Sequence, residues 1–227
     1  MADTPLSGRF LQKVTTHMLQ GLYAIADVQH TGAHDFFDSV QSVLLAGVRI
    51  IQYRDKINDP VERTRIARQL RLATSRHACL LLINDDVELA RVVDADGVHL
   101  GKDDLEVSQA RALLGADKMI GVSCYNQYEN AVQAVAKGAT YIAFGSFFAS
   151  PSKPSAPRAE VELITRAKRD LEVPVCAIGG ITPNNMIPLL HAGADMIAVI
   201  SGIFSAPSPG QSAQHYLALM QPNCAAS

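Results

Sequence analysis

Eight short apolar segments recur along the chain at nearly regular spacing, and this repeat constrains the fold more than any other feature. From Leu22 to Met196 the chain advances 174 residues over seven intervals, and an interval of about 25 residues is the size of one strand followed by one helix. The predicted strands are residues 22–27, 48–53, 79–84, 97–100, 119–124, 141–144, 175–178 and 196–200. Each run is apolar throughout instead of alternating, which is typical of parallel strands buried on both faces.

Eight strand–helix units predict an α/β fold, a single (β/α)8 TIM barrel with an N-terminal extension. A doubly wound open sheet stays as the alternative, because periodicity does not show that the sheet closes. The length of 227 residues and the hydrophobic fraction of 48% suit one large domain. We expect residues 1–20 to form the extension, residues 21–220 the catalytic barrel and residues 221–227 a C-terminal tail.

Helix signals fall between the predicted strands. Residues 59–62 read Asp-Pro-Val-Glu, which places a cap, a proline at the first helical position and a glutamate in the first turn. Residues 126–129 read Asn-Gln-Tyr-Glu and predict a capping box before another helix. Thr182, which precedes a proline, predicts a further helix start, and Gly193 predicts the end of that helix. A closing helix is expected after about residue 207.

Composition and charge exclude several classes of protein. Twenty Lys and Arg against 22 Asp and Glu give a net charge of −2, so neither a nucleic-acid footprint nor a polybasic membrane patch is expected. The apolar runs are far shorter than the roughly 20 residues of a membrane span, and the start of the chain has no signal-peptide pattern. We therefore expect a cytoplasmic protein, and the sequence leaves a homo-oligomer open. The four cysteines form no C-x-x-C pair and are expected to be free structural thiols.

A cationic set follows the second predicted strand. Residues 52–56 read Gln-Tyr-Arg-Asp-Lys, and alternation along a strand points Gln52, Arg54 and Lys56 the same way. In a barrel, functional residues collect at the carboxyl ends of the strands. Two cations and an amide at that end suit a polyanionic ligand. A rim of salt bridges is the alternative.

Acidic residues follow the third and fourth strands. Asp85 and Asp86 come directly after Asn84, and Asp104 lies four residues beyond the fourth strand. Carboxylates on adjacent strand ends can bind Mg²⁺, which often takes its other oxygen ligands from phosphates. The alternative is that these acids lie in solvated loops, which have the same sequence pattern. His99, inside the fourth strand, is expected to support the core or a neighbouring group instead of acting as a catalyst.

Hydroxyl and glycine residues follow the last three strands. The loop over residues 145–154 is rich in serine and carries one lysine, as expected of a lid over an anion. Residues 179–180 are a glycine pair, and residues 201–202 are Ser-Gly. Barrels commonly build a phosphate site from backbone N–H groups at these two strand ends. One barrel mouth would thus bind two phosphorylated small molecules, one of them escorted by Mg²⁺.

These motifs together resemble those of the thiamine-phosphate synthase family, over residues 22–204. The matching segments are Gln52-x-Arg54-x-Lys56, Asn84-Asp85, Gly97-Val98-His99-Leu100-Gly101-x-x-Asp104, Gly121-Val122-Ser123, Ser150-x-Ser152-Lys153, Ile178-Gly179-Gly180-Ile181 and Val199-Ile200-Ser201. The resemblance implies a barrel transferase that joins 4-amino-2-methyl-5-hydroxymethylpyrimidine diphosphate to thiazole phosphate. It also implies that diphosphate is released by Mg²⁺-assisted dissociative loss.

The resemblance also implies roles for individual residues. Those implied to bind the pyrimidine diphosphate are Gln52, Arg54, Lys56, Asn84, Ser123 and Lys153. Of these residues, the ones implied to be catalytic are Arg54, Lys56, Ser123 and Lys153. Asp85 and Asp104 would bind Mg²⁺. Those implied to bind the thiazole phosphate are Ser150, Ser152, Gly180, Ile200 and Ser201. The family usually has threonine at positions 150 and 152, and arginine is frequent where this chain has Asp86.

Two other functions stay open. A thiazole tautomerase-like barrel would share the thiazole-phosphate site but lack the set Arg54, Lys56, Asp85 and Lys153, all four of which are present here. A non-catalytic phosphate-binding barrel would bind ligand without turnover, because one displaced loop can abolish chemistry. Release of diphosphate that depends on the thiazole phosphate distinguishes the synthase from both.

Overall fold

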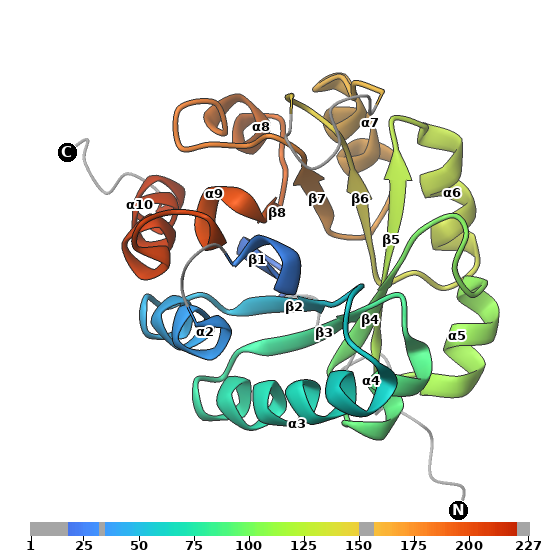
Figure 1. The fold of residues 1–227 in the computed structure, drawn as a ribbon. Helices are drawn as coiled ribbons and strands as arrows, with labels where there is room; N and C mark the ends of the chain where they lie inside the picture. The colour runs from blue at the N-terminus through green and yellow to red at the C-terminus, as the bar shows by residue number, and fades with distance from the viewer. Residues whose placement is uncertain (1–17, 32–34, 150–156, 222–227) are drawn as a thin grey trace, which may run out of the picture.

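Eight parallel strands close into a barrel in the computed structural model, which describes residues 18–31, 35–149 and 157–221 (Figure 1). The strands are β1 Gly21–Asp27, β2 Ile50–Arg54, β3 Leu80–Asn84, β4 Gly97–Leu100, β5 Met119–Tyr125, β6 Tyr141–Phe144, β7 Val175–Ile178 and β8 Met196–Val199. Each strand pairs with the next one in the chain, and β1 also pairs with β8, with Tyr23 opposite Ala198. The predicted (β/α)8 barrel is therefore confirmed, and the open sheet is excluded.

The strand bounds differ little from those predicted. Three strands, β4, β6 and β7, have the predicted limits. β2 begins at Ile50 instead of Val48, because the Val48 N–H bonds back to the Val43 carbonyl and so belongs to the end of the preceding helix. β8 ends at Val199 instead of Ile200, because Ile200 already caps the following helix.

Helices surround the strands in the ring seen in Figure 1. They are η1 Val28–His30, α2 Phe36–Leu45, α3 Pro60–Arg76, α4 Val87–Val92, α5 Val107–Leu114, α6 Tyr128–Ala136, α7 Glu162–Asp170, α8 Ile187–His191, α9 Ser201–Phe204 and α10 Pro209–Met220. The predicted start of α3 is confirmed, since the Asp59 carboxylate accepts from the N–H groups of Val61 and Glu62. The closing helix predicted after residue 207 is α10.

The helix predicted after residues 126–129 is present as α6, but its predicted capping box is wrong, and so is the helix start predicted at Thr182. Asn126 makes no cap for α6: Tyr125 has φ 55° and turns the chain after β5, and the Asn126 side chain donates to the Arg158 carbonyl at 3.3 Å. No helix begins at Thr182, because the Asn185 side chain accepts from the Thr182 N–H at 2.7 Å and folds this segment into a turn. The helix starts later, at Ile187, and Gly193 with φ 99° follows its end as predicted.

The buried side chains form two separate layers. One layer fills the barrel interior and includes Tyr23, Met119, Tyr141 and Met196, and the other lies between the strands and the helices. This division is expected when side chains alternate between the two faces of a closed sheet. Among the described cysteines, all three are buried free thiols, as predicted, and position 224 lies outside the described residues.

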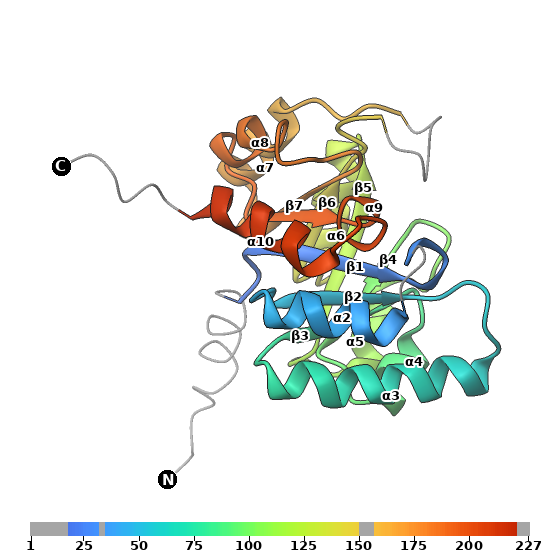
Figure 2. The same cartoon turned by 60° about the vertical axis from the view of Figure 1, so that its left-hand side comes forward.

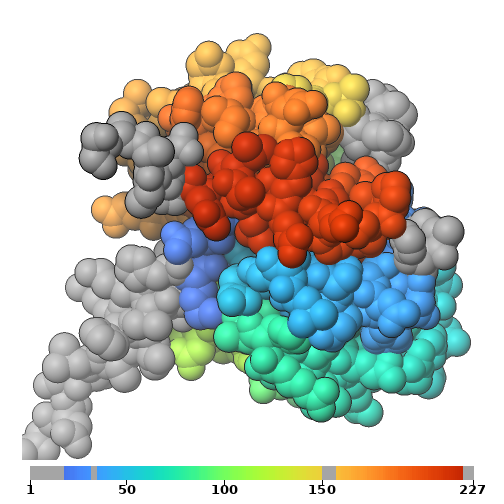
Figure 3. Space-filling view, turned by 90° about the vertical axis from the view of Figure 1, so that its left-hand side faces the viewer, coloured from blue at the N-terminus to red at the C-terminus, as the bar shows by residue number. Residues whose placement is uncertain are grey.

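The C-terminal helix closes the ring of helices. α10 packs against α2, which follows the first strand, and the space-filling view shows the two segments side by side (Figure 3). The first strand begins at Gly21 and α10 ends at Met220, while most of the expected N-terminal extension and C-terminal tail lies outside the described residues. Within the described part of the chain, no helix is both long and apolar enough to cross a membrane.

Candidate active site

The carboxyl ends of the strands lie together at one end of the barrel, on the right in Figure 2. The predicted site residues that the structure describes all lie on the last residues of strands or just after them: Gln52, Arg54, Lys56, Asn84, Asp85, Asp104, Ser123, Gly180, Ile200 and Ser201. Parallel topology brings them to one mouth. Three further predicted residues, Ser150, Ser152 and Lys153, lie outside the described residues.

Both cations at the carboxyl end of β2 pair with an acid. Arg54 donates to Asp27, which ends β1, and Lys56 donates to Asp85, which follows β3. Asp27 is 1% exposed, so Arg54 is paired with a buried carboxylate. Sequence reasoning missed Asp27, although an acid at the carboxyl end of the first apolar run was the signal. The cations remain part-exposed, so the residues that form the salt-bridged rim are the same ones that are predicted to bind an anion.

A second missed acid holds the loop that carries Lys56. Asp55 is buried and accepts hydrogen bonds from the Tyr53 hydroxyl at 2.7 Å, from two backbone N–H groups, and from the Asn58 side chain at 2.8 Å. Burial by itself would raise the pKa of Asp55, but the hydrogen bonds from Asn58, Tyr53 and Ile57 outweigh it and lower that pKa. The charged form of Asp55 is therefore built into the fold beside the mouth.

The two predicted magnesium ligands face each other. Burial opposes ionisation of Asp85, but hydrogen bonds with Lys56 and Asp104 outweigh it and lower the pKa of Asp85. Burial and the nearby Asp85 carboxylate raise the pKa of Asp104. Asp85 has φ 64°, in the left-handed region that non-glycine residues seldom adopt. A strained backbone at a strand end is typical of functional sites.

Asp86 has a structural position. Its carboxylate caps α4 by accepting from the Leu89 N–H at 2.8 Å, and it accepts from Arg63 of α3 at 2.8 Å. An arginine at this position could not provide the cap, because guanidinium has no hydrogen-bond acceptor. The acid found where arginine is frequent in the family thus ties α3 to α4.

Ser123 and Gln52 are the two ends of a hydrogen-bonded series inside the barrel. Gln52 contacts the Tyr23 hydroxyl at 2.6 Å, Tyr23 contacts the Tyr141 hydroxyl at 2.9 Å, and Tyr141 contacts His99 Nδ1 at 2.9 Å. His99 Nε2 in turn lies 2.9 Å from Ser123 Oγ. The expectation that His99 supports a neighbouring group agrees with these contacts. Sequence reasoning missed both tyrosines, since each lies in an apolar run.

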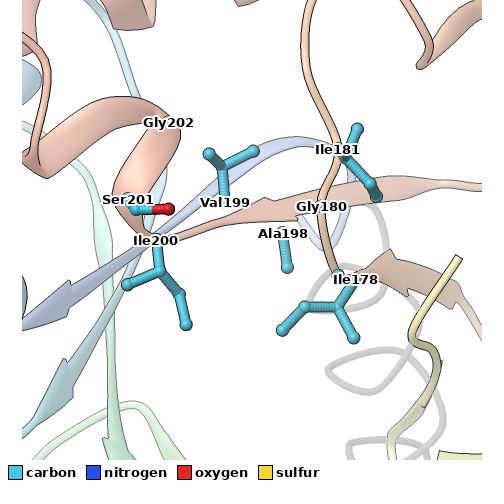
Figure 4. A pocket seen from close by; sticks show the side chains of 9 residues that line it. Ile178, Gly180, Ile181, Ala198, Val199, Ile200, Ser201 and Gly202 are labelled. Carbon is cyan, nitrogen blue, oxygen red and sulfur yellow. The ribbon is translucent and has the colours of Figure 1, made fainter. Parts of the chain in front are cut away.

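A pocket lies between the ends of β7 and β8 (Figure 4). Its lining runs from Ile178 to Ile181 on one side and from Ala198 to Gly202 on the other. Gly180 has φ 63°, and a Cβ there would lie 2.2 Å from the Ala149 carbonyl oxygen. Two strand ends are thus brought together as predicted, and backbone surfaces and the Ser201 hydroxyl line the space that a phosphate would need.

Comparisons with known proteins agree on one family. A profile of the family described as thiamine monophosphate synthase matches residues 22–203. A thiamine-phosphate synthase of Thioalkalivibrio sulfidiphilus is 44% identical over 207 residues, 91% of this chain and 98% of that protein. Another, from an Azoarcus species, is 49% identical over 201 residues, 88% of this chain and 97% of that protein. The solved structure of a thiamine phosphate pyrophosphorylase from Pyrococcus furiosus has a TM-score of 0.78 and 32% identity, covering 88% of this chain and 95% of that one.

The closed barrel, with acids, cations and glycine turns gathered at the carboxyl ends of its strands, defines an enzyme of the (β/α)8-barrel class. Within that class, the chain belongs to the thiamine monophosphate synthase family. It is therefore a transferase of thiamine biosynthesis.

Proposed function

We propose that this barrel mouth joins 4-amino-2-methyl-5-hydroxymethylpyrimidine diphosphate to thiazole phosphate with the help of Mg²⁺, giving thiamine phosphate and diphosphate. The observation that carries the proposal is the convergence of Lys56, Asp85 and Asp104 at the mouth of a barrel of this family. Cations and facing carboxylates together suit a diphosphate bound with a divalent metal.

The residues present fit Mg²⁺. Asp85 and Asp104 lie close together, and their interaction lowers the pKa of Asp85 and raises the pKa of Asp104. A cation between the two carboxylates would relieve their repulsion. Mg²⁺ commonly binds through one or two carboxylates and takes its other ligands from phosphates and water. In the described part of the chain no group of three or more His, Cys, Asp or Glu could hold a metal. When bound, Mg²⁺ would neutralise charge on the diphosphate oxygens.

Side chains of the mouth would assist the departure of diphosphate. The bond between the pyrimidine methylene carbon and the diphosphate oxygen breaks, and both electrons leave with diphosphate. Arg54, Lys56 and Lys153 would take up the growing negative charge, an electrostatic contribution that commonly dominates catalysis. Gln52, Asn84 and Ser123 would hold the pyrimidine, whose 4-amino group stabilises the carbon cation.

Capture of the cation requires a positioned thiazole. Gly180, Ile200 and Ser201 would hold its phosphate in the pocket between β7 and β8, with Ser150 and Ser152 of the preceding loop completing the site. The thiazole nitrogen then donates its electron pair to the carbon, and the gain comes from holding both reactants in line. No protein nucleophile takes part in this reaction. We further propose a cytoplasmic enzyme with neither nucleic-acid nor membrane partners, and leave a homo-oligomer open.

One assay tests the function. The purified protein is incubated with both substrates and Mg²⁺, and released diphosphate and thiamine phosphate are measured. We expect both products in equal amounts, and neither when the thiazole phosphate or Mg²⁺ is omitted. Binding of thiazole phosphate without product would indicate a non-catalytic phosphate-binding barrel, and isomerisation of the thiazole alone would indicate the tautomerase reaction; either result overturns the proposal.

A further inference from the structure

Asp27, the last residue of β1, is an acid buried too deeply to bind a ligand itself. Its side chain is 1% exposed, whereas that of Asp85, which follows β3, is 25% exposed. A buried carboxylate is costly unless charged groups or hydrogen-bond donors surround it. The contacts that surround the Asp27 carboxylate therefore indicate what this residue does.

The two oxygens of this carboxylate have different partners. Oδ1 accepts from the Gln29 N–H at 3.0 Å and so caps η1, the turn that follows β1 at the mouth end of the barrel (Figure 2). Oδ2 accepts from Arg54 Nη1. It also lies 3.2 Å from His30 Nδ1, which is close enough for an ion pair but is not aligned as a hydrogen bond. The strand register pairs Asp27 with Arg54, so one carboxylate joins its own turn to the guanidinium of the neighbouring strand.

The turn η1 is itself fixed by side chains. The Thr31 hydroxyl donates to the Val28 carbonyl at 3.1 Å, and the Ser205 hydroxyl donates to the His30 carbonyl at 2.9 Å. Ser205 directly follows α9, whose first residue, Ser201, lines the pocket between β7 and β8. A residue that orients another side chain must itself be held by its surroundings. These contacts meet that requirement for the carboxylate that caps the turn.

Arg54 keeps hydrogen-bond donors beyond the one that Asp27 accepts. Its guanidinium carries five N–H groups in a rigid plane. Among the described residues, the only hydrogen bond of this side chain is the one from Nη1 to Asp27, and the side chain is 28% exposed. The N–H groups on Nε and Nη2 are therefore left for an anion, and a planar guanidinium can bind two oxygens of a phosphate at once. Holding one nitrogen of the plane restricts the direction of the others.

We propose that Asp27 is a positioning residue: it holds the Arg54 guanidinium by one nitrogen, so that the remaining N–H groups are in place for the diphosphate before the reaction begins. The inference rests on the proposed function for the role of Arg54, and on the contacts for the role of Asp27. Donors that are already oriented stabilise the charge that grows on a leaving group. A misplacement of about 1 Å can cost about 100-fold in rate, so a residue that touches no ligand can still control the reaction.

Replacing Asp27 by asparagine keeps the size of the side chain and removes its charge. Whichever way the amide turns, its NH₂ group faces either the Gln29 N–H or Arg54 and cannot accept from it. We expect Asp27→Asn to lower kcat about 10- to 100-fold, with little change in the KM for thiazole phosphate. Binding of inorganic diphosphate with Mg²⁺, measured by calorimetry in the full-length protein, should weaken as well, and this second measurement does not depend on turnover.

A double-mutant cycle separates positioning from a general effect on the fold. If Asp27 acts through Arg54, adding Asp27→Asn to the Arg54→Gln protein should leave kcat and the affinity for diphosphate the same within about twofold, because the group being positioned is already gone. Circular dichroism and thermal unfolding show whether each variant is folded.

Asp96→Asn is the matched control. Asp96 also accepts from an arginine, Arg71 at 2.6 Å, and from a backbone N–H, that of Leu81 at 2.7 Å, but it lies at the amino end of β4, away from the mouth. We expect its kcat and its affinity for diphosphate to be unchanged.

Several results overturn the inference and leave the proposed function intact. They are a wild-type kcat in Asp27→Asn, the same fold-loss from Asp27→Asn with and without Arg54, and a double variant that does not fold while Arg54→Gln does. If Asp27→Asn alone does not fold, the comparison of Arg54→Gln with the double variant still decides. Absence of both product and diphosphate binding in the unsubstituted protein counts against the proposed function instead.

Discussion

The acidic residues of the mouth differ in their burial and in their hydrogen-bond partners. Asp27 and Asp55 are buried under Arg54 and the following loop, and each accepts from neighbours within the fold. Asp85 and Asp104 face each other at the surface of the mouth. The first pair shapes the site, and the second pair is left to interact with a ligand.

Replacing Asp104 by asparagine tests the metal assignment. Asp104→Asn keeps an oxygen that can accept from the Gly101 N–H, a bond of 2.7 Å, but removes the charge facing Asp85. We expect the Mg²⁺ concentration for half-maximal rate to rise at least about tenfold and the rate to fall, since even indirect supports of a metal site are worth about 10- to 100-fold. Initial rates against Mg²⁺ concentration measure both. Asp103→Asn, at the exposed neighbouring position, is the control, and an unchanged Mg²⁺ dependence in Asp104→Asn would remove this residue from the site.

Asp55 gives a prediction about stability and pH. Its pKa is lowered in the folded state, so its contribution is fully present above the ordinary aspartate pKa of about 3.9 and is lost as the pH falls through the lower folded value. We expect Asp55→Asn to lower the free energy of unfolding at pH 7 by about 1.5–3 kcal/mol, the value of hydrogen bonds to a charged group. The difference from the unsubstituted protein should disappear at low pH. Urea unfolding across pH 2–7 checks this, and a difference that is constant over this range would contradict it.

At the scale of elements, the turn after β7 lies close to the segment that follows β6. Phe148 donates its N–H to the Gly179 carbonyl at 2.9 Å, and the Asn185 side chain donates to the Gly180 carbonyl at 3.1 Å. The first contact joins the segment after β6 to the turn after β7, and the second holds that turn itself. A change at Gly180 therefore acts on both segments that flank the predicted thiazole-phosphate site.

Gly180→Val tests that site. The valine Cβ would press on the Ala149 carbonyl in a backbone conformation with φ 63°. We expect the KM for thiazole phosphate to rise much more than the KM for pyrimidine diphosphate. Gly138→Val is the control, because Gly138 also has positive φ but the nearest atom to its Cβ position, Arg111 Nε, is 3.9 Å away, an ordinary contact. An equal rise in KM for both substrates in Gly180→Val would indicate misfolding instead of a blocked site.

Lys153 belongs to the loop between β6 and α7 and lies outside the described residues. Charge on the diphosphate grows as the bond breaks, so a nearby cation stabilises the transition state more than the ground state. We expect Lys153→Met to lower kcat about 100- to 1000-fold, or about 2.7–4 kcal/mol, with little change in KM. Steady-state kinetics measure both quantities. Lys137→Met, which removes an exposed lysine paired with Glu106, serves as control. Unchanged kcat in Lys153→Met would leave Arg54 and Lys56 as the cations that assist departure.

At the scale of the whole molecule, α10 links the last strand to the first half of the ring. Tyr216 is buried, and its hydroxyl donates to the Ile181 carbonyl at 2.9 Å, next to the pocket between β7 and β8. Gly202 lies close beneath, since a Cβ there would be 2.6 Å from the Tyr216 hydroxyl. The closing helix thus supports, from outside the barrel, the side of the mouth that is predicted to bind the thiazole phosphate.

Truncating Tyr216 should therefore destabilise the entire fold. We expect Tyr216→Ala to lower the free energy of unfolding by about 3–5 kcal/mol, the cost of removing a large buried aromatic ring. Tyr216→Phe keeps the ring and loses one hydrogen bond, so its cost should be about 0.5–1.5 kcal/mol. Denaturant unfolding of both variants gives the two values. Equal costs for the two would show that the hydroxyl, and not the packing of the ring, holds α10.

Local patterns in the sequence determined the elements of the barrel. Continuous apolar runs at a spacing of one strand and one helix predicted all eight strands, because burial on both faces leaves no room for polar alternation. Asp59 before Pro60 predicted the start of α3, since capping needs only neighbours in the chain. The placement of Gln52, Lys56, Asp85 and Ser201 at one mouth also followed, because parallel strand ends share one edge.

Only the tertiary structure decided which distant groups meet. Closure of the sheet depends on β1 pairing with β8. These strands lie at opposite ends of the chain, so no local sequence pattern indicates that they pair. The contact of Asp27 with Arg54, and the series through Tyr23 and Tyr141, join residues from 27 to 118 positions apart. A buried tyrosine in an apolar run has the same sequence pattern whether its hydroxyl meets a partner or not. Packing inside the closed barrel supplies that partner.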